Sequence, residues 1–315
     1  MGADVSKHTP DIITIGASAG GVQALKSLAS QLPAEFDAAI FVVIHLAARA
    51  PTYLADILNR AGPVSAVTAT DGAPIRPRMI YVASPDHHLL VANEHMHLSR
   101  GPKEGRYRPS INVTFRSAAM AYGDRVIGVI LTGMLDDGTA GLWEIKARGG
   151  ITIVQDPGDA QFSSMPSSAL EDVRVDYKVE IANLGDLLTR LVEGEIEVPA
   201  NERTVRPADF PFSGLTCPEC RGPIWQMQSK PVEFRCRVGH IYSGRTMLEE
   251  HTSMQERKLY EAILALQEGA DIAEFMAARQ EGPRREKLLM EAEQIRAQSE
   301  IIKGLLSDRR VESVA

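Results

Sequence analysis

This sequence of 315 residues has no long apolar run, no excess of positive charge and only three cysteines, and each of these features argues against a class of protein. No apolar run reaches the roughly 20 residues that a transmembrane helix needs. The first ten residues, MGADVSKHTP, lack the apolar core of a signal peptide. The 34 Lys and Arg are scattered and are outnumbered by 41 Asp and Glu. We therefore expect a cytoplasmic protein that neither inserts into a membrane nor binds nucleic acid.

Residues 11–25, DIITIGASAGGVQAL, predict a buried strand, a tight turn and a helix. The β-branched residues favour the strand, and the glycines allow a sharp turn. Ser18 lies in this turn, next to the start of the helix. Unpaired N–H groups and a partial positive charge gather at such a position. A hydroxyl there is well placed to attack a carbonyl carbon.

Three interpretations of this turn stay open from its own residues. A dinucleotide site would need a glycine at the position of Ser18, and the next strand ends in His45 rather than in an acidic residue that holds a ribose. Residues 16–20 also fit the G-x-S-x-G pattern of a nucleophile elbow. In the third interpretation, Ser18 only caps the helix.

Strands and helices alternate through the first half of the chain. This alternation predicts an α/β fold with a mostly parallel sheet flanked by helices. Beyond the first strand and helix, we expect strands at 39–44, 64–69, 79–83, 126–131 and 151–155, helices at 51–60, 110–122 and 140–148, and a hairpin at 86–100.

Three polar positions directly follow predicted strands: Ser18, His45 and the pair Asp136-Asp137. Because the carboxyl ends of parallel strands meet at one edge of a sheet, these side chains should lie together. A serine, a histidine and an aspartate are a nucleophile, a general base and an acid that orients the base. The chain order differs from the Ser-acid-His order of ordinary α/β-hydrolases.

Several motifs together resemble the catalytic domain of bacterial chemotaxis protein-glutamate methylesterases, the CheB family. They are GASAGG, IHL, RYRPSINVTFRSAA, GVILTGMLDDGTAGL and QDPGDAQFSSMPSSAL, spread over residues 11–195. The resemblance implies a Rossmann-like serine hydrolase that needs no cofactor for catalysis. It implies cleavage of glutamate γ-methyl esters on methyl-accepting chemotaxis receptors, with release of methanol, and deamidation of receptor glutamines.

The resemblance also assigns residues. Ser18 matches the family's nucleophile, His45 its histidine and Asp137 its aspartate, and the amide of Met134 is a candidate donor to the oxyanion. The chain departs from the usual pattern at Ala19, Leu135 and Asp136. Asp136 places a second carboxylate beside Asp137, so which of the two orients His45 is left open.

Other polar residues have plainer interpretations. We expect the hairpin histidines to be solvated rather than metal ligands, and we expect Ser163 and Ser164 to lie at a turn or helix start. Arg106, Arg108 and Arg116 could meet an acidic receptor surface or simply face solvent. The hairpin histidines are His87, His88, His95 and His97.

The cysteines point to a metal site in the second half. An odd number within 217–236 argues against disulfides. C-P-E-C followed by C-R-V-G-H offers three thiolates and one imidazole with the spacing of a zinc ribbon. We expect a structural zinc on Cys217, Cys220, Cys236 and His240, which would supply folding energy to a module too small for its own core.

These patterns predict four segments: a catalytic domain at 1–197, a linker at 198–213, a zinc-ribbon-like module at 214–244 and a helical hairpin at 245–315. The hairpin has an apolar stripe broken at Gly282-Pro283, which suits internal packing or a homodimer. The resemblance implies a stand-alone form without the receiver domain of other family members. The alternatives are a serine esterase or amidase with another substrate, and a non-catalytic adaptor organised by zinc.

Overall fold

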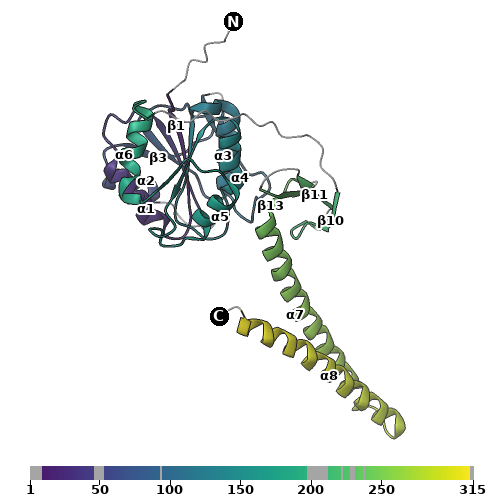
Figure 1. Cartoon of the computed structure of the whole chain (residues 1–315). Coiled ribbons are helices and arrows are strands. Elements are labelled where there is room, and N and C mark those ends of the chain that lie inside the picture. Colours follow the sequence, from purple (N-terminus) through teal and green to yellow (C-terminus); the bar gives the residue numbers. More distant parts are fainter. Residues whose placement is uncertain are drawn as a thin grey trace. The chain divides into compact units, whose positions relative to one another are not determined.

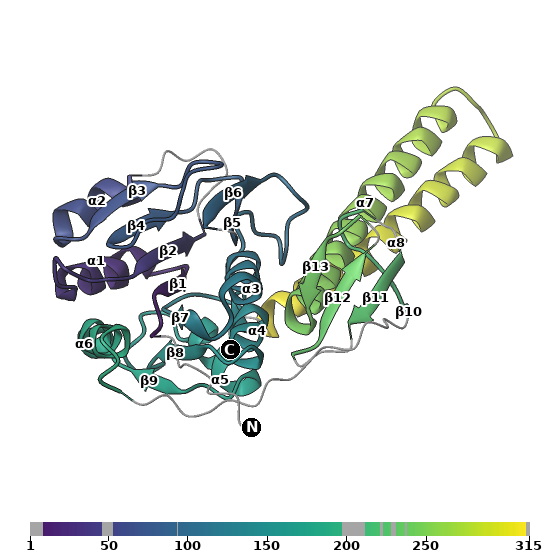
Figure 2. The ribbon, with the colours of Figure 1, turned by 90° about the horizontal axis from the view of Figure 1, so that it is seen from above.

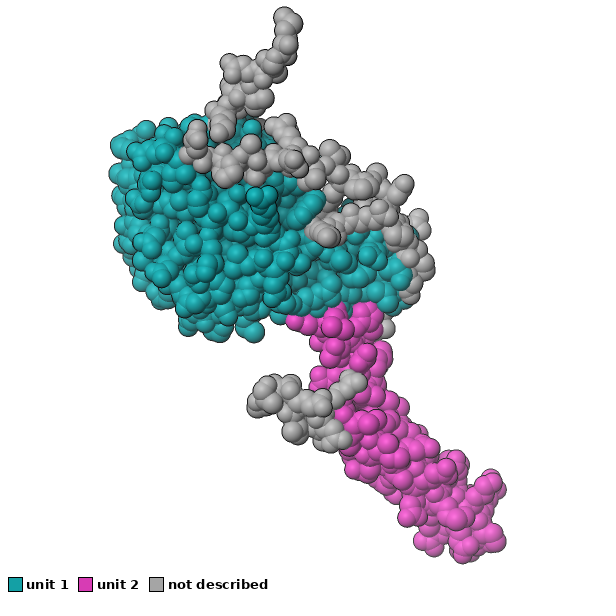
Figure 3. Space-filling model, viewed as in Figure 1, with its two compact units in different colours: residues 1–247 teal, residues 248–315 magenta. Residues whose placement is uncertain are grey.

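The computed structural model describes residues 9–45, 53–92, 94–196, 212–220, 223–227, 231–236 and 238–312. The chain forms two compact units, residues 1–247 and residues 248–315, coloured teal and magenta in Figure 3. The first unit holds a large α/β layer structure and a small antiparallel sheet, and the second is helical.

A seven-stranded parallel sheet forms the centre of the first unit (Figure 1), with the strand order β3-β4-β2-β1-β7-β8-β9. The chain turns to one side of β1 for β2 and to the other side for β7, so β1 lies at the switch point of the sheet. Ligands bind at such a point in open parallel sheets. The strands are β1 (Ile12–Ala17), β2 (Ala39–Ile44), β3 (Ser65–Thr68), β4 (Met79–Val82), β7 (Val126–Ile130), β8 (Ile151–Gln155) and β9 (Tyr177–Val179).

Helices cover both faces of this sheet (Figure 2). One face packs against α1 (Gly21–Gln31), α2 (Leu54–Ala61) and α6 (Ile181–Val192). The other packs against α3 (Ile111–Tyr122), α4 (Thr139–Ala147) and α5 (Ser164–Asp172). The central strands are buried on both faces, which is why they read as continuous apolar runs rather than alternating ones. The predicted α/β class with a parallel sheet is confirmed.

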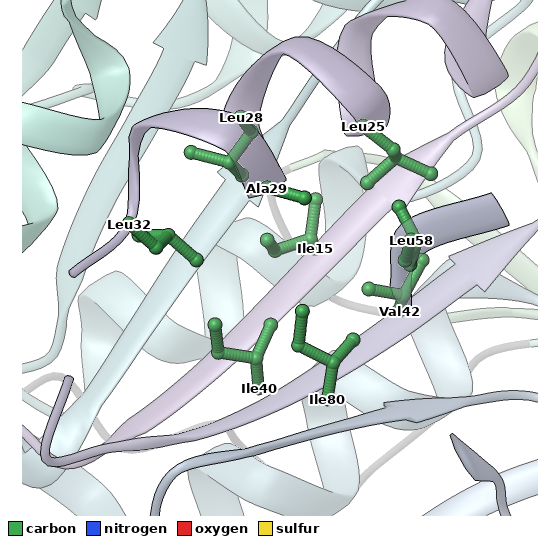
Figure 4. A pocket seen from close by; sticks show the side chains of 9 residues that line it. All are labelled: Ile15, Leu25, Leu28, Ala29, Leu32, Ile40, Val42, Leu58 and Ile80. Carbon is green, nitrogen blue, oxygen red and sulfur yellow. The ribbon is translucent and has the colours of Figure 1, made fainter. Parts of the chain in front are cut away.

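The core of the first face contains one small void of about 10 Å³ between α1, β1 and β2 (Figure 4). Its lining is wholly apolar, so it offers a ligand no polar contact and has at most the volume of one water molecule. It is a packing gap, not a binding site. The lining residues are Ile15, Leu25, Leu28, Ala29, Leu32, Ile40, Val42, Leu58 and Ile80.

Most predicted elements fall within one to three residues of the observed ones, and the strands at 39–44 and 151–155 match residue for residue. The hairpin is β5 (His88–Ala92) with β6 (His95–Ser99), whose turn at Glu94 has a φ of 61°. The helix expected at 51–60 starts at Leu54, and Pro51 lies outside the described residues. Neither the short β9 nor helix α6 is predicted from sequence, although Leu184, Leu188 and Leu191 of α6 recur at helical spacing.

The cysteine-containing segment also belongs to the first unit. It forms a four-stranded antiparallel sheet, β10-β11-β12-β13, larger than the single hairpin expected from sequence. Its strands are β10 (Phe212–Thr216), β11 (Pro223–Met227), β12 (Glu233–Cys236) and β13 (Ile241–Ser243). The linker predicted at 198–213 falls outside the described residues except at its end, where β10 begins.

Two long helices, α7 (Gly244–Ala277) and α8 (Pro283–Glu312), form the hairpin. The connection turns at Gly282, where φ is 65°. Small side chains let the helices approach, with Ala270, Ala273 and Ala292 buried between them. Of the helices in the described part of the chain, none combines the length and apolar character needed to cross a membrane.

Candidate active site

Ser18 is held in a tight turn at the carboxyl end of β1. Its amide donates to the carbonyl of Thr132 after β7 at 3.0 Å, and its carbonyl accepts from Gly21 at the start of α1. Gly20 has a φ of 77°, which an L-residue with a side chain rarely adopts. A Cβ at Gly16 would collide with the side chain of Ile111, so the glycines predicted for this turn serve both its conformation and the close packing of α3.

His45 follows β2 and lies between Ser18 and Asp137. Its Nδ1 is 3.1 Å from Ser18 Oγ, and its Nε2 is 2.8 Å from Asp137 Oδ2. Its side chain is only 7% exposed, and its ring is stacked on Tyr107 with centroids 3.5 Å apart. With Nε2 protonated toward the carboxylate, Nδ1 is free to accept the proton of the serine hydroxyl. The structure thus brings together three residues that lie 27 and 92 positions apart in the chain.

The carboxylate of Asp137 is fixed by the amino end of α3. Oδ2 accepts from the amide of Ile111 at 2.8 Å, while Oδ1 accepts from Ser110 Oγ at 2.9 Å and the amide of Asn112 at 3.2 Å. Burial alone would raise the pKa of Asp137, but the hydrogen bonds from His45 and the helix amides outweigh it and lower the pKa below its ordinary value. The group is therefore an anion that can orient and stabilise a protonated His45.

The turn that carries Asp137 is also tied to α3. Asn112 Oδ1 accepts from the amides of Gly138 at 3.0 Å and Gly141 at 2.7 Å. Asp136 is buried, and its carbonyl accepts from the amide of Thr139. The geometry answers the question left open by sequence: the carboxylate that contacts His45 belongs to Asp137.

Backbone amides near Ser18 are available for an oxyanion. Within the described part of the chain, the amides of Met134, Ala19 and Gly20 have no hydrogen-bond acceptor. The loop after β7 approaches Ser18 closely, because a Cβ at Gly133 would lie 2.9 Å from Ser18 Cβ. Met134, singled out by the sequence, is therefore in the segment beside the nucleophile.

Other residues named from sequence have different surroundings. His88 is buried and bonded to the carbonyl of Pro102, so the expectation of a solvated residue is wrong there; burial lowers its pKa. His95 and His97 are exposed, as expected. Ser163 precedes α5, and Ser164 Oγ accepts from the Leu135 amide, which agrees with a helix-start role.

Two arginines considered for receptor binding are engaged inside the protein. Arg108 pairs with Asp86 at 2.7 Å and donates to the carbonyl of Gly101. Arg116 bonds both carboxylate oxygens of Glu104 and reaches Glu233 in β12 at 3.2 Å. The sequence could not distinguish such internal pairs from a solvated basic face, because the partners lie on distant segments.

The second predicted site is assembled as well. Cys217, Cys220, Cys236 and His240 place one ligand atom each within 4.8 Å of one another, the only such group in the described residues. Cys236 Sγ is 3.6 Å from Cys220 Sγ and 3.4 Å from His240 Nδ1. A tetrahedral zinc with bonds of about 2.3 Å separates its sulfur ligands by about 3.8 Å, so the residues fit this metal.

The surroundings of the cluster support metal ligation. Glu219 Oε2 lies 3.4 Å from His240 Nε2. A carboxylate in this position commonly orients an imidazole that binds a metal through its other nitrogen. Burial would raise the pKa of the Cys236 thiol, but amides that include that of His240 lower it and favour the thiolate. All four positions of a tetrahedral shell are protein side chains, which is typical of structural sites.

Sequence reasoning missed the immediate supports of the triad. Tyr107, which stacks on His45, and Ser110, which bonds Asp137, both lie in the motif RYRPSINVTFRSAA. That motif carried the family resemblance, but nothing in its spacing points across the fold to His45 or Asp137. From sequence alone, the motif indicated that this segment matters, but it assigned no role to Tyr107 or Ser110.

A parallel α/β sheet with a hydroxyl, an imidazole and a buried carboxylate in hydrogen-bond series at its switch point is the architecture of a serine hydrolase. The family model for CheB methylesterase matches residues 13–188. The chain belongs to the CheB methylesterase family.

Individual relatives of this chain also carry methylesterase names. A protein-glutamate methylesterase/protein-glutamine glutaminase of Geobacter metallireducens is 40% identical over 187 residues, which are 58% of this chain and 50% of that protein. A Leptospira interrogans protein assigned the same two activities is 38% identical over 188 residues, 59% of this chain and 97% of the relative. The crystal structure of the Thermotoga maritima CheB methylesterase catalytic domain matches with a TM-score of 0.57 and 32% identity, over 59% of this chain and 100% of that one.

Proposed function

We propose that this chain is a protein-glutamate methylesterase in which Ser18 is the nucleophile, His45 the general base and Asp137 the group that orients it. The observation that carries the proposal is the continuous hydrogen-bond series from Ser18 Oγ through His45 to Asp137. We infer the reaction from the names of the relatives and the roles of the three residues from the hydrogen-bond geometry. A non-catalytic adaptor would not need this series, which favours the enzyme.

The proposed reaction proceeds through an acyl-enzyme. His45 Nδ1 takes the proton of Ser18 Oγ as the oxygen attacks the γ-ester carbonyl, and the methoxide leaves as methanol with that proton. Water then attacks the acyl-enzyme by the same proton route and releases the glutamate carboxylate. The amide of Met134, with those of Ala19 and Gly20, stabilises the oxyanion. This chemistry uses no cofactor.

A glutamine side chain fits the same scheme, with ammonia leaving in place of methanol, so we propose protein-glutamine glutaminase activity at the same site. The proposed substrates are methyl-accepting chemotaxis receptors, and the cytoplasmic location expected from sequence goes with them. A homodimer through α7 and α8 stays a prediction, as do the boundaries of the four proposed segments.

Methanol release from methylated chemoreceptor membranes tests the proposed function. We expect the full chain to release methanol from methylated receptors and ammonia from receptors carrying glutamine at the same positions. Receptors with unmodified glutamate at those positions are the matched control and should yield neither product. Hydrolysis of simple esters with no release from methylated receptors would instead favour the esterase with another substrate.

We also propose that Cys217, Cys220, Cys236 and His240 hold a structural zinc ion. The small sheet has few buried residues of its own, grouped around the cysteines, so the metal would supply much of its folding energy. We expect one zinc per chain by elemental analysis and three thiols that react with a disulfide reagent only after chelation. The Cys236→Ser variant should lose the metal; three reactive thiols in the untreated protein would contradict the site.

A further inference from the structure

Tyr107 makes a close aromatic contact with the imidazole of His45. The two rings are parallel, at an angle of 1°, with centroids 3.5 Å apart. His45 can bond Ser18 and Asp137 together only in one ring plane, because its two nitrogens point in different directions within that plane. The Tyr107 ring, lying flat against one face of the imidazole, prevents the imidazole from tilting out of this plane. It leaves both nitrogens of His45 free to bond Ser18 and Asp137.

Tyr107 is the last residue of a tight turn. The amide of Tyr107 donates to the carbonyl of Glu104 at 3.0 Å, and the amide of Glu104 donates to the carbonyl of Tyr107 at 3.2 Å. The two central residues, Gly105 and Arg106, have φ values of 55° and 75°. Positive φ at both positions defines the type I′ class of turn, and Arg106 is strained there because it is not a glycine. Contacts from outside the turn must therefore hold it.

Those contacts come from the cysteine-containing sheet. The carbonyl of Ile241, the residue after His240, accepts from the amide of Gly105 at 2.8 Å. Arg116 bonds Glu104 in the turn and Glu233 in β12, and both carboxylates are at least 95% buried. Removing an arginine that two buried carboxylates share is costly, because each carboxylate would be left as an unpaired buried charge.

We propose that Tyr107 is a positioning residue for His45, and that the Cys₃His sheet sets the position of Tyr107 through the turn at 104–107. The path is continuous: the metal ligand His240, then Ile241, the amide of Gly105 and the ring of Tyr107 on His45. This inference rests on the proposed function. It makes the reactivity of Ser18 depend on the integrity of a metal site that takes no part in the chemistry.

Substitutions at Tyr107 test the first half in the full-length, metal-loaded protein. We expect Tyr107→Leu to lower kcat for methanol release roughly 10- to 100-fold with KM little changed, because the imidazole loses its fixed plane. Tyr107→Phe keeps the ring and should restore kcat to within about threefold of the wild type. The matched control is Tyr122→Leu at the far end of α3, which removes an aromatic ring but none that touches His45. Equal kcat for wild type and Tyr107→Leu would overturn the proposal, as would a loss in Tyr107→Phe equal to that in Tyr107→Leu.

Hydrogen exchange after chelation of the metal tests the second half without using activity. We expect the amide of Gly105 to exchange at least about tenfold faster in the chelated protein, because its acceptor Ile241 lies beside the metal ligand His240. The amide of Val129, inside β7, is the control and should not change. Unchanged exchange at Gly105 while the thiols become reactive would overturn the link to the metal site.

The labelling rate of Ser18 with a fluorophosphonate separates failure of this inference from failure of the proposed function. The probe reports activation of the serine without any receptor. If the wild type releases no methanol but labels at Ser18 faster than Tyr107→Leu does, the receptor substrate is wrong and the positioning role stands. If both label at the same rate, the positioning role is wrong, whatever the substrate.

Discussion

Ser18→Ala is expected to lower kcat for methanol release about 10⁶-fold, the loss typical when the nucleophile of a serine hydrolase is removed. Alanine has no oxygen to form the acyl-enzyme, and the remaining oxyanion donors give only weak catalysis of direct water attack. The ratio is measured by following methanol release from methylated receptors, over hours for the variant and over seconds for the wild type.

Folding and receptor binding should survive the Ser18→Ala substitution. Within the described residues, the only side-chain hydrogen bond of Ser18 is the one to His45, whereas its backbone bonds to Thr132 and Gly21 are unaffected. Ser163→Ala is the matched control, because Ser163 makes no side-chain cap bond before α5 and should retain wild-type kcat. Wild-type turnover by Ser18→Ala would remove the proposed nucleophile.

Asp137→Asn is expected to lower kcat about 10⁴-fold, as the equivalent change does in other triads. In the part of the chain that the structure describes, four groups bond this carboxylate and all of them donate: His45, Ser110 and the amides of Ile111 and Asn112. An asparagine NH₂ must face at least one of these donors, so His45 loses its acceptor or α3 loses a partner at its amino end. We also expect the free energy of unfolding to fall by roughly 1–3 kcal/mol from the mismatched buried groups.

Asp136→Asn is the control for this substitution, since it removes the neighbouring charge but not the bond to His45. It should change kcat less than about tenfold. If the two variants lose activity equally, the charge of the pair rather than the oriented bond is what matters, and the assignment to Asp137 is wrong.

The stability effect of Asp137 should depend on pH. Its pKa in the folded protein lies below the ordinary value of 3.8, because hydrogen bonds to the anion outweigh the effect of burial. A depressed pKa contributes stability above the unfolded value, and this contribution is lost as pH falls through the folded pKa. The difference in stability between the wild type and Asp137→Asn should therefore narrow below about pH 4, as urea unfolding at a series of pH values would show.

The sequence predicts the fold and the triad because both depend on local patterns. Buried parallel strands read as short β-branched runs, and a polar residue directly after such a run must lie at the functional edge of the sheet. Ser18 and His45 directly follow β1 and β2, and Asp137 lies in the loop that follows β7. The cysteine spacing likewise anticipates the Cys₃His cluster.

What the sequence could not supply are contacts between distant segments with no periodic signal. Tyr107 lies in a turn with no helix or strand pattern, so its place on His45 depends on how that turn packs. In the sequence, Arg116 is only a basic residue on a predicted helix, because its partner Glu233 in β12 lies 117 residues further along the chain. His88 alternates like a solvated strand residue, but packing over it buries its ring.

Mass spectrometry of the protein after labelling with a fluorophosphonate tests whether Ser18 is the nucleophile, because the probe bonds only to an activated serine. We expect a single adduct on the peptide that contains Ser18, lost in Ser18→Ala and strongly reduced in His45→Ala. An adduct on Ser163 or Ser164 instead, or no adduct in a preparation that releases methanol, would contradict this assignment.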